Sequence, residues 1–235
     1  MFAEKATRTV KPNRQQLVVV IGDNSGSMRG QKAEAAVEGV RQMINECQSR
    51  SGSEQSLYRV LLILFGNEAT IYPNCERTPV LEIASEEITF HGDAGGTNLR
   101  AALELAYEQI SDYLVEIAEH PHKNKHPLPL LILYSDGHNG DNFGRPEAAA
   151  KKLKELTYDS ESILIVTAGV AVDAKDKPDE YTLKAIASSY QDIPLYVPIH
   201  KANSLSCLLA AAGSSAASTA GELYDVIRGY LEQSE

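Results

Sequence analysis

The chain has 235 residues, a formal net charge of −10, three cysteines and an apolar fraction of 43%. Its length and apolar content allow one large core, as in a single α/β domain. The acidic balance argues against a protein that reads nucleic-acid backbones through a basic face, and it also opposes docking on anionic lipid. A basic or neutral protein partner remains compatible with this charge.

The cysteines and the first residues favour a cytoplasmic protein. Cys47, Cys75 and Cys207 are far apart and fit neither a disulfide framework nor a zinc motif, so we interpret them as small buried apolar residues in a reducing compartment. Residues 1–16 hold no apolar run of the kind found in secretory signals. Since no window reaches about 18 consecutive apolar residues, we predict no membrane span.

The first half of the chain alternates strand and helix patterns. Residues 1–16 are polar and are predicted to form a loose arm, whereas 17–235 are predicted to form one domain because no linker or internal repeat interrupts them. The apolar patterns predict, in chain order, a buried strand, an amphipathic helix, a second buried strand and a short antiparallel edge strand: residues 17–21, 31–48, 58–65 and 69–72. Residues 74–90 are predicted to be a connection with one short element.

The second half continues this alternation. A Gly-rich loop precedes a helix that Thr97 or Asn98 caps and that continues to Leu114. Further elements are predicted as strand, helix, strand, helix, strand, helix and helix: residues 130–134, 146–156, 162–168, 179–190, 193–199, 204–212 and 222–232. Pro194 and Pro198 place their strand at an edge, because proline cannot donate to a ladder. The fold class predicted is α/β: a doubly wound, mostly parallel six-stranded sheet flanked by helices.

Oxygen-bearing side chains follow two of these strands and precede one helix. Asp23, Ser25 and Ser27 come after the first strand, Asp136 follows the fourth, and Thr97 lies on the Gly-rich loop. If the strand order is 3-2-1-4-5-6, the first and fourth strands are neighbours at the reversal where such sheets bind ligands. Two neighbouring carboxylates repel each other, and a divalent cation between them removes that repulsion. Hard oxygen donors suit Mg²⁺, Ca²⁺ or Mn²⁺.

These motifs resemble a known family. The D-x-S-x-S stretch, the G-G-T-N-L loop and the S-D-G loop, in this order over most of the chain, are similar to the metal-ion-dependent adhesion site of von Willebrand factor A domains. The resemblance implies that Ser25 and Ser27 bind Mg²⁺ directly, and that Asp23, Thr97 and Asp136 bind it directly or through water. It also implies one open position for an Asp or Glu of a partner protein, and no chemistry of the domain's own.

Three finer expectations come from the resemblance. The stretch SGSMRGQKAEA is similar to intracellular bacterial members, the TerY-like proteins of tellurite-resistance and kinase/phosphatase-associated systems. Gly22 departs from the family's pattern and predicts a looser strand end. The last helix, 222–232, is a candidate for an element that shifts with metal coordination, or for a fixed cover on the sheet.

Other interpretations stay open at this point. The aspartates and hydroxyls could be ordinary turn and cap residues, or a site that has lost its metal while the helices bind a partner. A metal-dependent hydrolase or phosphatase could use Asp23 or Asp136, although no acidic neighbour or lysine accompanies Asp23 as a phospho-acceptor would require. His138 is interpreted as a solvated loop residue, because no nucleophile–base set accompanies it. The same interpretation covers His120, His122 and His126.

Overall fold

The computed structural model describes residues 15–51, 57–119, 126–158, 160–171 and 177–200, together with Ser204, Leu208, Leu209 and Asp225. Several predicted features lie wholly or mostly outside these residues: the arm up to residue 14, His120, His122, Cys207 and the helices 204–212 and 222–232. Ser204, Leu208 and Leu209 are helical, as is Asp225.

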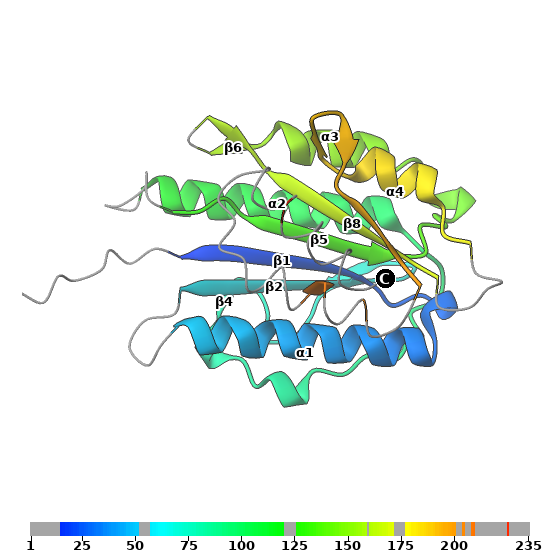
Figure 1. The fold of residues 1–235 in the computed structure, drawn as a ribbon, viewed down its shortest axis with the longest axis horizontal. Helices are drawn as coiled ribbons and strands as arrows, with labels where there is room; N and C mark the ends of the chain where they lie inside the picture. The colour runs from blue at the N-terminus through cyan, green and yellow to red at the C-terminus, as the bar shows by residue number, and fades with distance from the viewer. Residues whose placement is uncertain are drawn as a thin grey trace, which may run out of the picture.

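The described residues form one central sheet with helices on both sides (Figure 1). The sheet contains seven strands: β1 (Gln16–Asp23), β2 (Tyr58–Phe65), β3 (Ala69–Ile71), β4 (Thr78–Pro79), β5 (Leu130–Ser135), β8 (Leu164–Val170) and β11 (Tyr196–Ile199). The helices are α1 (Gln31–Ser51), α2 (Leu99–Ala118), α3 (Glu147–Glu155) and α4 (Glu180–Ile186). Short 3₁₀ turns are η1 (Gly26–Met28), η2 (Val80–Glu82), η3 (Ser85–Glu87) and η5 (Asp141–Phe143).

The strand order confirms a doubly wound topology. The path is β11-β8-β5-β1-β2-β3, and β4 pairs with β2 beside β3. The pairs β1–β2, β1–β5, β5–β8 and β8–β11 are parallel, whereas β3 and β4 run antiparallel to β2. The first strand and the fourth of the six expected strands are therefore neighbours, which is the arrangement that the site prediction required.

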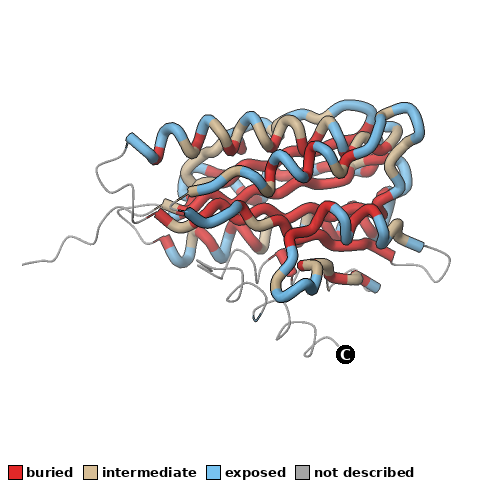
Figure 2. The backbone as a smooth tube through the Cα atoms, turned by 90° about the horizontal axis from the view of Figure 1, so that it is seen from above, coloured by how far each residue is buried: buried red, intermediate tan, exposed pale blue. Residues whose placement is uncertain are grey.

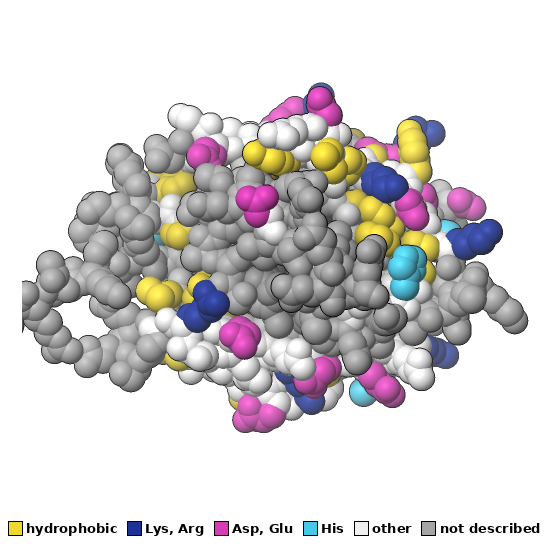
Figure 3. Space-filling model, viewed as in Figure 1, with side chains coloured by type: hydrophobic (Ala, Val, Ile, Leu, Met, Phe, Trp, Pro, Cys, Tyr) yellow, Lys and Arg dark blue, Asp and Glu magenta, His cyan; other side chains and the backbone are white. Residues whose placement is uncertain are grey.

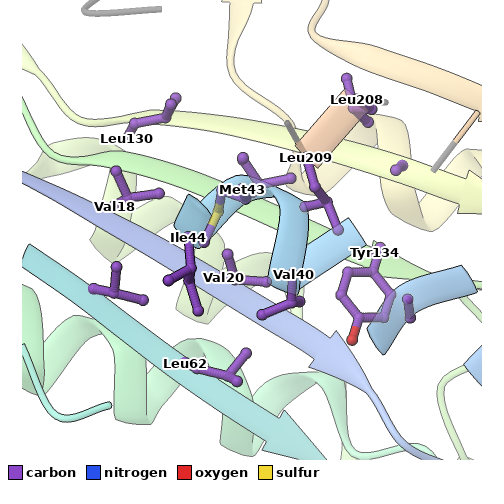
Figure 4. Packing of buried hydrophobic residues seen from close by; sticks show 14 of the residues in the cluster. Val18, Val20, Val40, Met43, Ile44, Leu62, Leu130, Tyr134, Leu208 and Leu209 are labelled. Carbon is purple, nitrogen blue, oxygen red and sulfur yellow. The ribbon is translucent and has the colours of Figure 1, made fainter. Parts of the chain in front are cut away.

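Both faces of the sheet are buried. Successive strand side chains point to opposite faces, so Val18 and Val20 join a core with α1 while Val19 and Ile21 join a core with α2, α3 and α4. Figure 4 shows Val18 and Val20 packed beside Val40 and Met43 of α1. In Figure 2 the strands are buried along their length, while the helices alternate between buried and exposed residues. This two-sided burial explains the continuous apolar runs in the sequence.

The strand predicted for 162–168 and the helix predicted for 179–190 have different bounds in the structure. Residues 161–162 belong to β7 (Glu161–Ser162), which pairs with β6 (Thr157–Tyr158), and the sheet strand begins only at Leu164. The helix predicted for 179–190 begins at Glu180 after its cap Asp179 and ends at Ile186.

The reason for the early helix end is a second hairpin. Strands β9 (Ser189–Tyr190) and β10 (Ile193–Pro194) are antiparallel and are joined by Gln191 and Asp192. Both turn residues have positive φ, 50° and 65°, as two-residue hairpin turns of the type I′ class need. The edge strand β11 is consequently shorter than predicted, although its place at the edge next to β8 is confirmed.

Gly22 does not loosen the end of β1, contrary to the sequence interpretation. It pairs with Tyr134 of β5, and a Cβ on Gly22 would lie 2.2 Å from the Tyr134 hydroxyl oxygen and 3.0 Å from a Leu64 methyl carbon. The tyrosine ring therefore fills the space that any larger residue would need. Glycine at this position is a packing requirement.

Two further points concern the rest of the described chain. His126 is buried and its Nδ1 lies 3.3 Å from the backbone nitrogen of Gln15, so the prediction of a solvated ring is wrong for this histidine. Gln16, predicted to belong to the arm, is the first residue of β1 and donates its N–H to the Leu57 carbonyl oxygen at 2.9 Å. Within the described ranges, we find no helix with both the length and the apolarity to traverse a bilayer.

Candidate metal centre

Three loops meet at the carboxyl edge of the sheet. Asp23 ends β1 and Ser135 ends β5, which are adjacent parallel strands, and Thr97 lies just before α2. All three segments lie at the ends to which the strand arrows of Figure 1 point. Asn98 caps α2 by accepting a hydrogen bond from the Ala101 N–H at 3.1 Å, so Thr97 is not the capping residue and its hydroxyl is not committed to that role.

The first loop gathers its own oxygen atoms. The Asp23 Oδ1 accepts the Ser25 N–H at 2.8 Å, a turn that folds the chain back over the carboxylate. The Ser25 and Ser27 hydroxyl oxygens lie 3.0 Å apart. Asp23 and Ser25 are buried, whereas Ser27 is exposed. The alternate spacing in the sequence thus places one carboxylate and two hydroxyls together, with Ser27 toward solvent.

The second loop is tied to the first by backbone hydrogen bonds. The Gly26 N–H donates to the Gly95 carbonyl oxygen, and the Ala94 N–H donates to the Asn24 carbonyl oxygen, both at 2.9 Å. The Asn24 side-chain oxygen also accepts the Gly92 N–H at 2.6 Å. Gly95 has φ +86°, a conformation that glycine adopts without strain. This loop therefore has a fixed path beside the first one.

The third loop closes the ring. The Ser135 hydroxyl donates to the Asp23 Oδ2 at 2.6 Å and accepts the Gly137 N–H at 2.8 Å. The Gly140 N–H donates to the Thr97 carbonyl oxygen at 2.9 Å. Each loop is thus bonded to the other two, so segments more than a hundred residues apart are held together. The sequence prediction that these segments converge is confirmed.

The two aspartates form a buried acidic pair. The pKa of Asp23 is raised from its ordinary 3.8 to about 6, chiefly by burial and also by the charge of Asp136, although hydrogen bonds from Ser135 and Ser25 act in the opposite direction. Asp136 is also buried and its Oδ1 accepts the His138 N–H at 3.3 Å. Among the described residues, neither carboxylate has an ion pair with a lysine or arginine.

This environment fits a bound cation. A buried pair of like charges is unfavourable unless a positive group compensates it. The neighbouring donors are hydroxyl oxygens, and within the described ranges no three His, Cys, Asp or Glu side chains gather as a metal site. Carboxylates combined with hydroxyls suit a hard divalent ion such as Mg²⁺ better than a softer one.

Other polar residues near the site form hydrogen bonds with the backbone or are exposed on the loops. Asn139 accepts the Leu99 N–H at 3.1 Å at the start of α2, and the His138 Nε2 lies 2.6 Å from the Lys177 carbonyl oxygen. Asp93 and Asp141 are exposed on the second and third loops. These positions agree with the interpretation of Asn139, Asp93 and Asp141 as turn or rim residues.

Sequence reasoning missed three residues that position these loops. Ser135 was visible in the S-D-G motif but was not given a role, although its hydroxyl contacts Asp23 directly. Asn24 and Asn67 were assigned no role either, yet the Asn24 side chain accepts the Gly92 N–H and the Asn67 side chain accepts the Gly96 N–H at 2.8 Å. The sequence does show polar residues close to the motifs, but a single sequence does not reveal which atoms they form hydrogen bonds with.

A family model described as the von Willebrand factor type A domain matches residues 17–201. The chain belongs to this family. The match covers all three loops of the site and the described sheet from Leu17 onward. The resemblance on which the sequence prediction rested is thereby confirmed for the vWA domain as a whole, but not for its TerY-like subgroup.

Solved structures share the fold at low identity. Proximal thread matrix protein 1 from the mussel byssus is 15% identical, with a TM-score of 0.59 over 85% of this chain and 47% of that one. The pilus adhesin SpaC from Lactobacillus rhamnosus GG, in an open conformation, is 16% identical, with a TM-score of 0.58 over 94% of this chain and 31% of that one. This vWA chain therefore spans less than half of either protein.

A further structure of the mussel protein has a zinc-occupied MIDAS motif, the metal-ion-dependent adhesion site; it is 15% identical, with a TM-score of 0.58 over 86% of this chain and 48% of that one. An aerotolerance-related membrane protein from Bacteroides fragilis NCTC 9343 is 19% identical, with a TM-score of 0.50 over 84% of this chain and 98% of that one. A comparison with curated proteins returns no match.

Proposed function

We propose that this vWA domain binds a partner protein through a divalent metal ion, with no chemical step of its own. The observation that supports this most is the buried pair of Asp23 and Asp136, which lacks a basic partner among the described residues and lies beside the hydroxyls of the first loop. Such a pair is costly in the absence of a cation.

Five side chains would hold the ion: Asp23, Ser25, Ser27, Thr97 and Asp136. We assign Mg²⁺ to the site, with Ca²⁺ and Mn²⁺ as alternatives, because hard oxygen donors favour these ions. Ser27 is the exposed member, so the solvent side of the ion would lie nearest to it. When bound, the ion would accept a carboxylate of an incoming Asp or Glu, and this contact would make the partner's binding depend on metal.

The proposal includes no nucleic-acid partner and no membrane contact. The chain carries a net charge of −10, which opposes phosphate backbones and anionic lipid. On the face shown in Figure 3, the described Lys and Arg side chains are interspersed with Asp and Glu. A nucleic-acid or anionic-lipid partner would instead require basic side chains that are clustered in a stripe.

On the SGSMRGQKAEA stretch we further propose a TerY-like protein of a bacterial tellurite-resistance or kinase/phosphatase-associated system. Cytoplasmic placement belongs to this proposal. It is supported by Cys75, which is free and buried, as cysteines in a reducing compartment are.

The test of the main proposal is a binding titration with an acidic probe. We would measure the affinity for the capped peptide Gly-Gly-Glu-Gly-Gly by NMR, with the Gln peptide as matched control. Binding is expected with Mg²⁺ and is expected to disappear in EDTA and in Asp23→Ala. Equal affinity in all three conditions contradicts the proposal.

A second assay separates this function from a hydrolase. Incubation with p-nitrophenyl phosphate and Mg²⁺ is expected to give no turnover above buffer. Turnover that Asp23→Asn abolishes would replace the binding module with a metal-dependent phosphatase, because the same carboxylate would then carry a reaction.

A further inference from the structure

A second polar-rimmed site lies away from the metal centre, at the β3 edge of the sheet. It is a cavity of about 210 Å³ between the turn after β3 and the segment that contains η2 and η3. Its floor is formed by the buried residues Cys75, Ile83 and Ile88. Drug-sized ligands occupy larger pockets, of about 300 Å³ or more, so this volume suits a single side chain.

The turn that forms one wall is fixed to β2. The Tyr72 N–H donates to the Leu62 carbonyl oxygen at 2.8 Å, and the Leu62 N–H donates to the Cys75 carbonyl oxygen at 3.1 Å. Asn74, at the tip of the turn, has a positive φ of 58°. The Tyr72 hydroxyl accepts the Thr89 N–H at 2.9 Å, which joins this wall to the end of the opposite segment.

The opposite wall is fixed by α1. The Gln48 side-chain amide donates to the carbonyl oxygens of Val80 and Ile83, at 2.9 and 2.8 Å. About two turns earlier in α1, Arg41 donates to the carbonyl oxygens of Glu86 and Ile88, at 2.9 and 3.1 Å. Both walls are thus held without a ligand, so an occupant would not have to order them.

The rim is acidic. Glu82 and Glu87, the last residues of η2 and η3, line the cavity and are exposed. Neither has an ion pair among the described residues. Two basic residues lie nearby: Arg77 is directed to Glu116 at 4.0 Å, and the Arg41 guanidinium is bound to the carbonyl oxygens of Glu86 and Ile88. Burial raises the pKa of the Cys75 thiol to about 11, so the side chains of the floor are neutral and the acidic groups of the lining are the two rim carboxylates.

We propose that this cavity binds a lysine side chain of a partner protein. The apolar floor would cover the aliphatic stem, whose removal from water favours binding, and the two rim carboxylates would face its ammonium group. A free diamine carries a second charge, which would have to lie over the apolar side chains of Ile83 and Ile88 at a cost in desolvation. The overall charge of −10 also favours a basic partner.

The test uses NMR titration of the ¹⁵N-labelled full chain in EDTA, so that the metal centre plays no part. The probe is Nα-acetyl-lysine N-methylamide, and its uncharged control is the norleucine analogue. Saturating shifts of the Asn74, Cys75 and Ala84 amides are expected for the lysine probe, with a dissociation constant on the order of millimolar. Equal binding of the norleucine analogue, or no shift of these amides, overturns the proposal.

Matched variants locate the contact. Glu82→Gln combined with Glu87→Gln is expected to weaken the lysine probe about 3- to 10-fold, as two exposed ion pairs would. Glu86→Gln, on the same 3₁₀ turn but outside the cavity lining, is expected to leave the affinity unchanged. An unchanged affinity in the double variant overturns the proposal, and tighter binding of putrescine than of the lysine probe would assign the cavity to free polyamines instead.

Discussion

Two pairs of carboxylates in the described part of the chain differ in their burial. Asp23 and Asp136 are buried at the carboxyl edge of the sheet, whereas Glu82 and Glu87 are exposed on the rim of a cavity with an apolar floor. A buried pair is poorly solvated, so its repulsion is relieved by a bound cation, as we propose, or by a proton. An exposed pair is solvated already and offers only a weak, exchangeable contact to a passing ammonium group.

The largest expected effect is the loss of metal stabilisation in Asp23→Asn. At a Mg²⁺ concentration of 100 times the dissociation constant, the ion stabilises the wild-type fold by about 2.7 kcal/mol. For a chain of this size we expect Tm to rise by roughly 5–10 °C, as measured by thermal unfolding with and without Mg²⁺. The control is Asp93→Asn, a substitution of an exposed aspartate on the second loop, which should show the same rise in Tm as wild type. An equal rise in Asp23→Asn would contradict the role of the buried pair in metal binding.

The pH dependence of the metal-free protein is the second prediction. The folded-state pKa of Asp23 is about 6, above the ordinary 3.8, so between these values the folded state binds a proton more tightly than the unfolded state does. The free energy of unfolding should therefore fall as pH rises through this window, by on the order of 2–3 kcal/mol from this group. Metal affinity should rise over the same range, because the ion binds the carboxylate form.

Urea unfolding in EDTA at pH 4 and pH 7 measures this effect. Wild type and Asp23→Asn share every other titrating group, so the difference between their pH dependences isolates Asp23. The variant is expected to be the more stable of the two at pH 7. Parallel pH profiles would show that the carboxylate is not destabilising in the folded state.

The third prediction concerns Ser135, whose hydroxyl donates to Asp23 at 2.6 Å. Ser135→Ala should weaken Mg²⁺ about 10- to 100-fold, as removal of a residue that orients a metal ligand does, measured by calorimetric titration. Ser188→Ala is the control, because Ser188 is also buried and accepts a hydrogen bond from the Ile165 N–H at 3.0 Å, but lies far from the site in the fold. It should lower stability and leave Mg²⁺ affinity unchanged, whereas equal losses of affinity would deny Ser135 a specific role.

The smallest effect is expected at the exposed pair. Glu82→Gln combined with Glu87→Gln should change the free energy of unfolding by less than about 0.5 kcal/mol, as surface substitutions without partners do. The Mg²⁺-induced change in Tm should be the same as in wild type. A large decrease in the free energy of unfolding, or in the Mg²⁺-induced change in Tm, would contradict the expectation that the exposed pair affects neither the fold nor the metal centre.

The fold was predictable where burial alone decides the residue pattern. The apolar runs of β1, β2 and β5 and the periodic faces of α1 and α2 follow from a sheet covered on both sides, and the order of the strands then follows from the usual connections. The hairpin at Gln191 and Asp192 was not predictable, because neither residue is a glycine or asparagine of the kind that signals such a turn. Gly22 was misread for a related reason, since its partner Tyr134 is 112 residues away.

The candidate site was predictable as a set of loops but not as a network. Alternate spacing identifies Asp23, Ser25 and Ser27, and strand ends identify Asp136. The hydrogen bond from Ser135 and the support that Asn24 gives to Gly92 depend on which atoms meet after folding. A sequence shows which residues could donate or accept, whereas only the fold decides their partners.

The most direct test of the central claim is anomalous diffraction from crystals grown with Mn²⁺. One strong peak is expected at the carboxyl edge of β1 and β5, within coordination distance of the Ser25 and Ser27 hydroxyl oxygens, with Asp23, Thr97 and Asp136 bonded directly or through water. A peak elsewhere, or none at this edge in protein saturated with the metal, would contradict it.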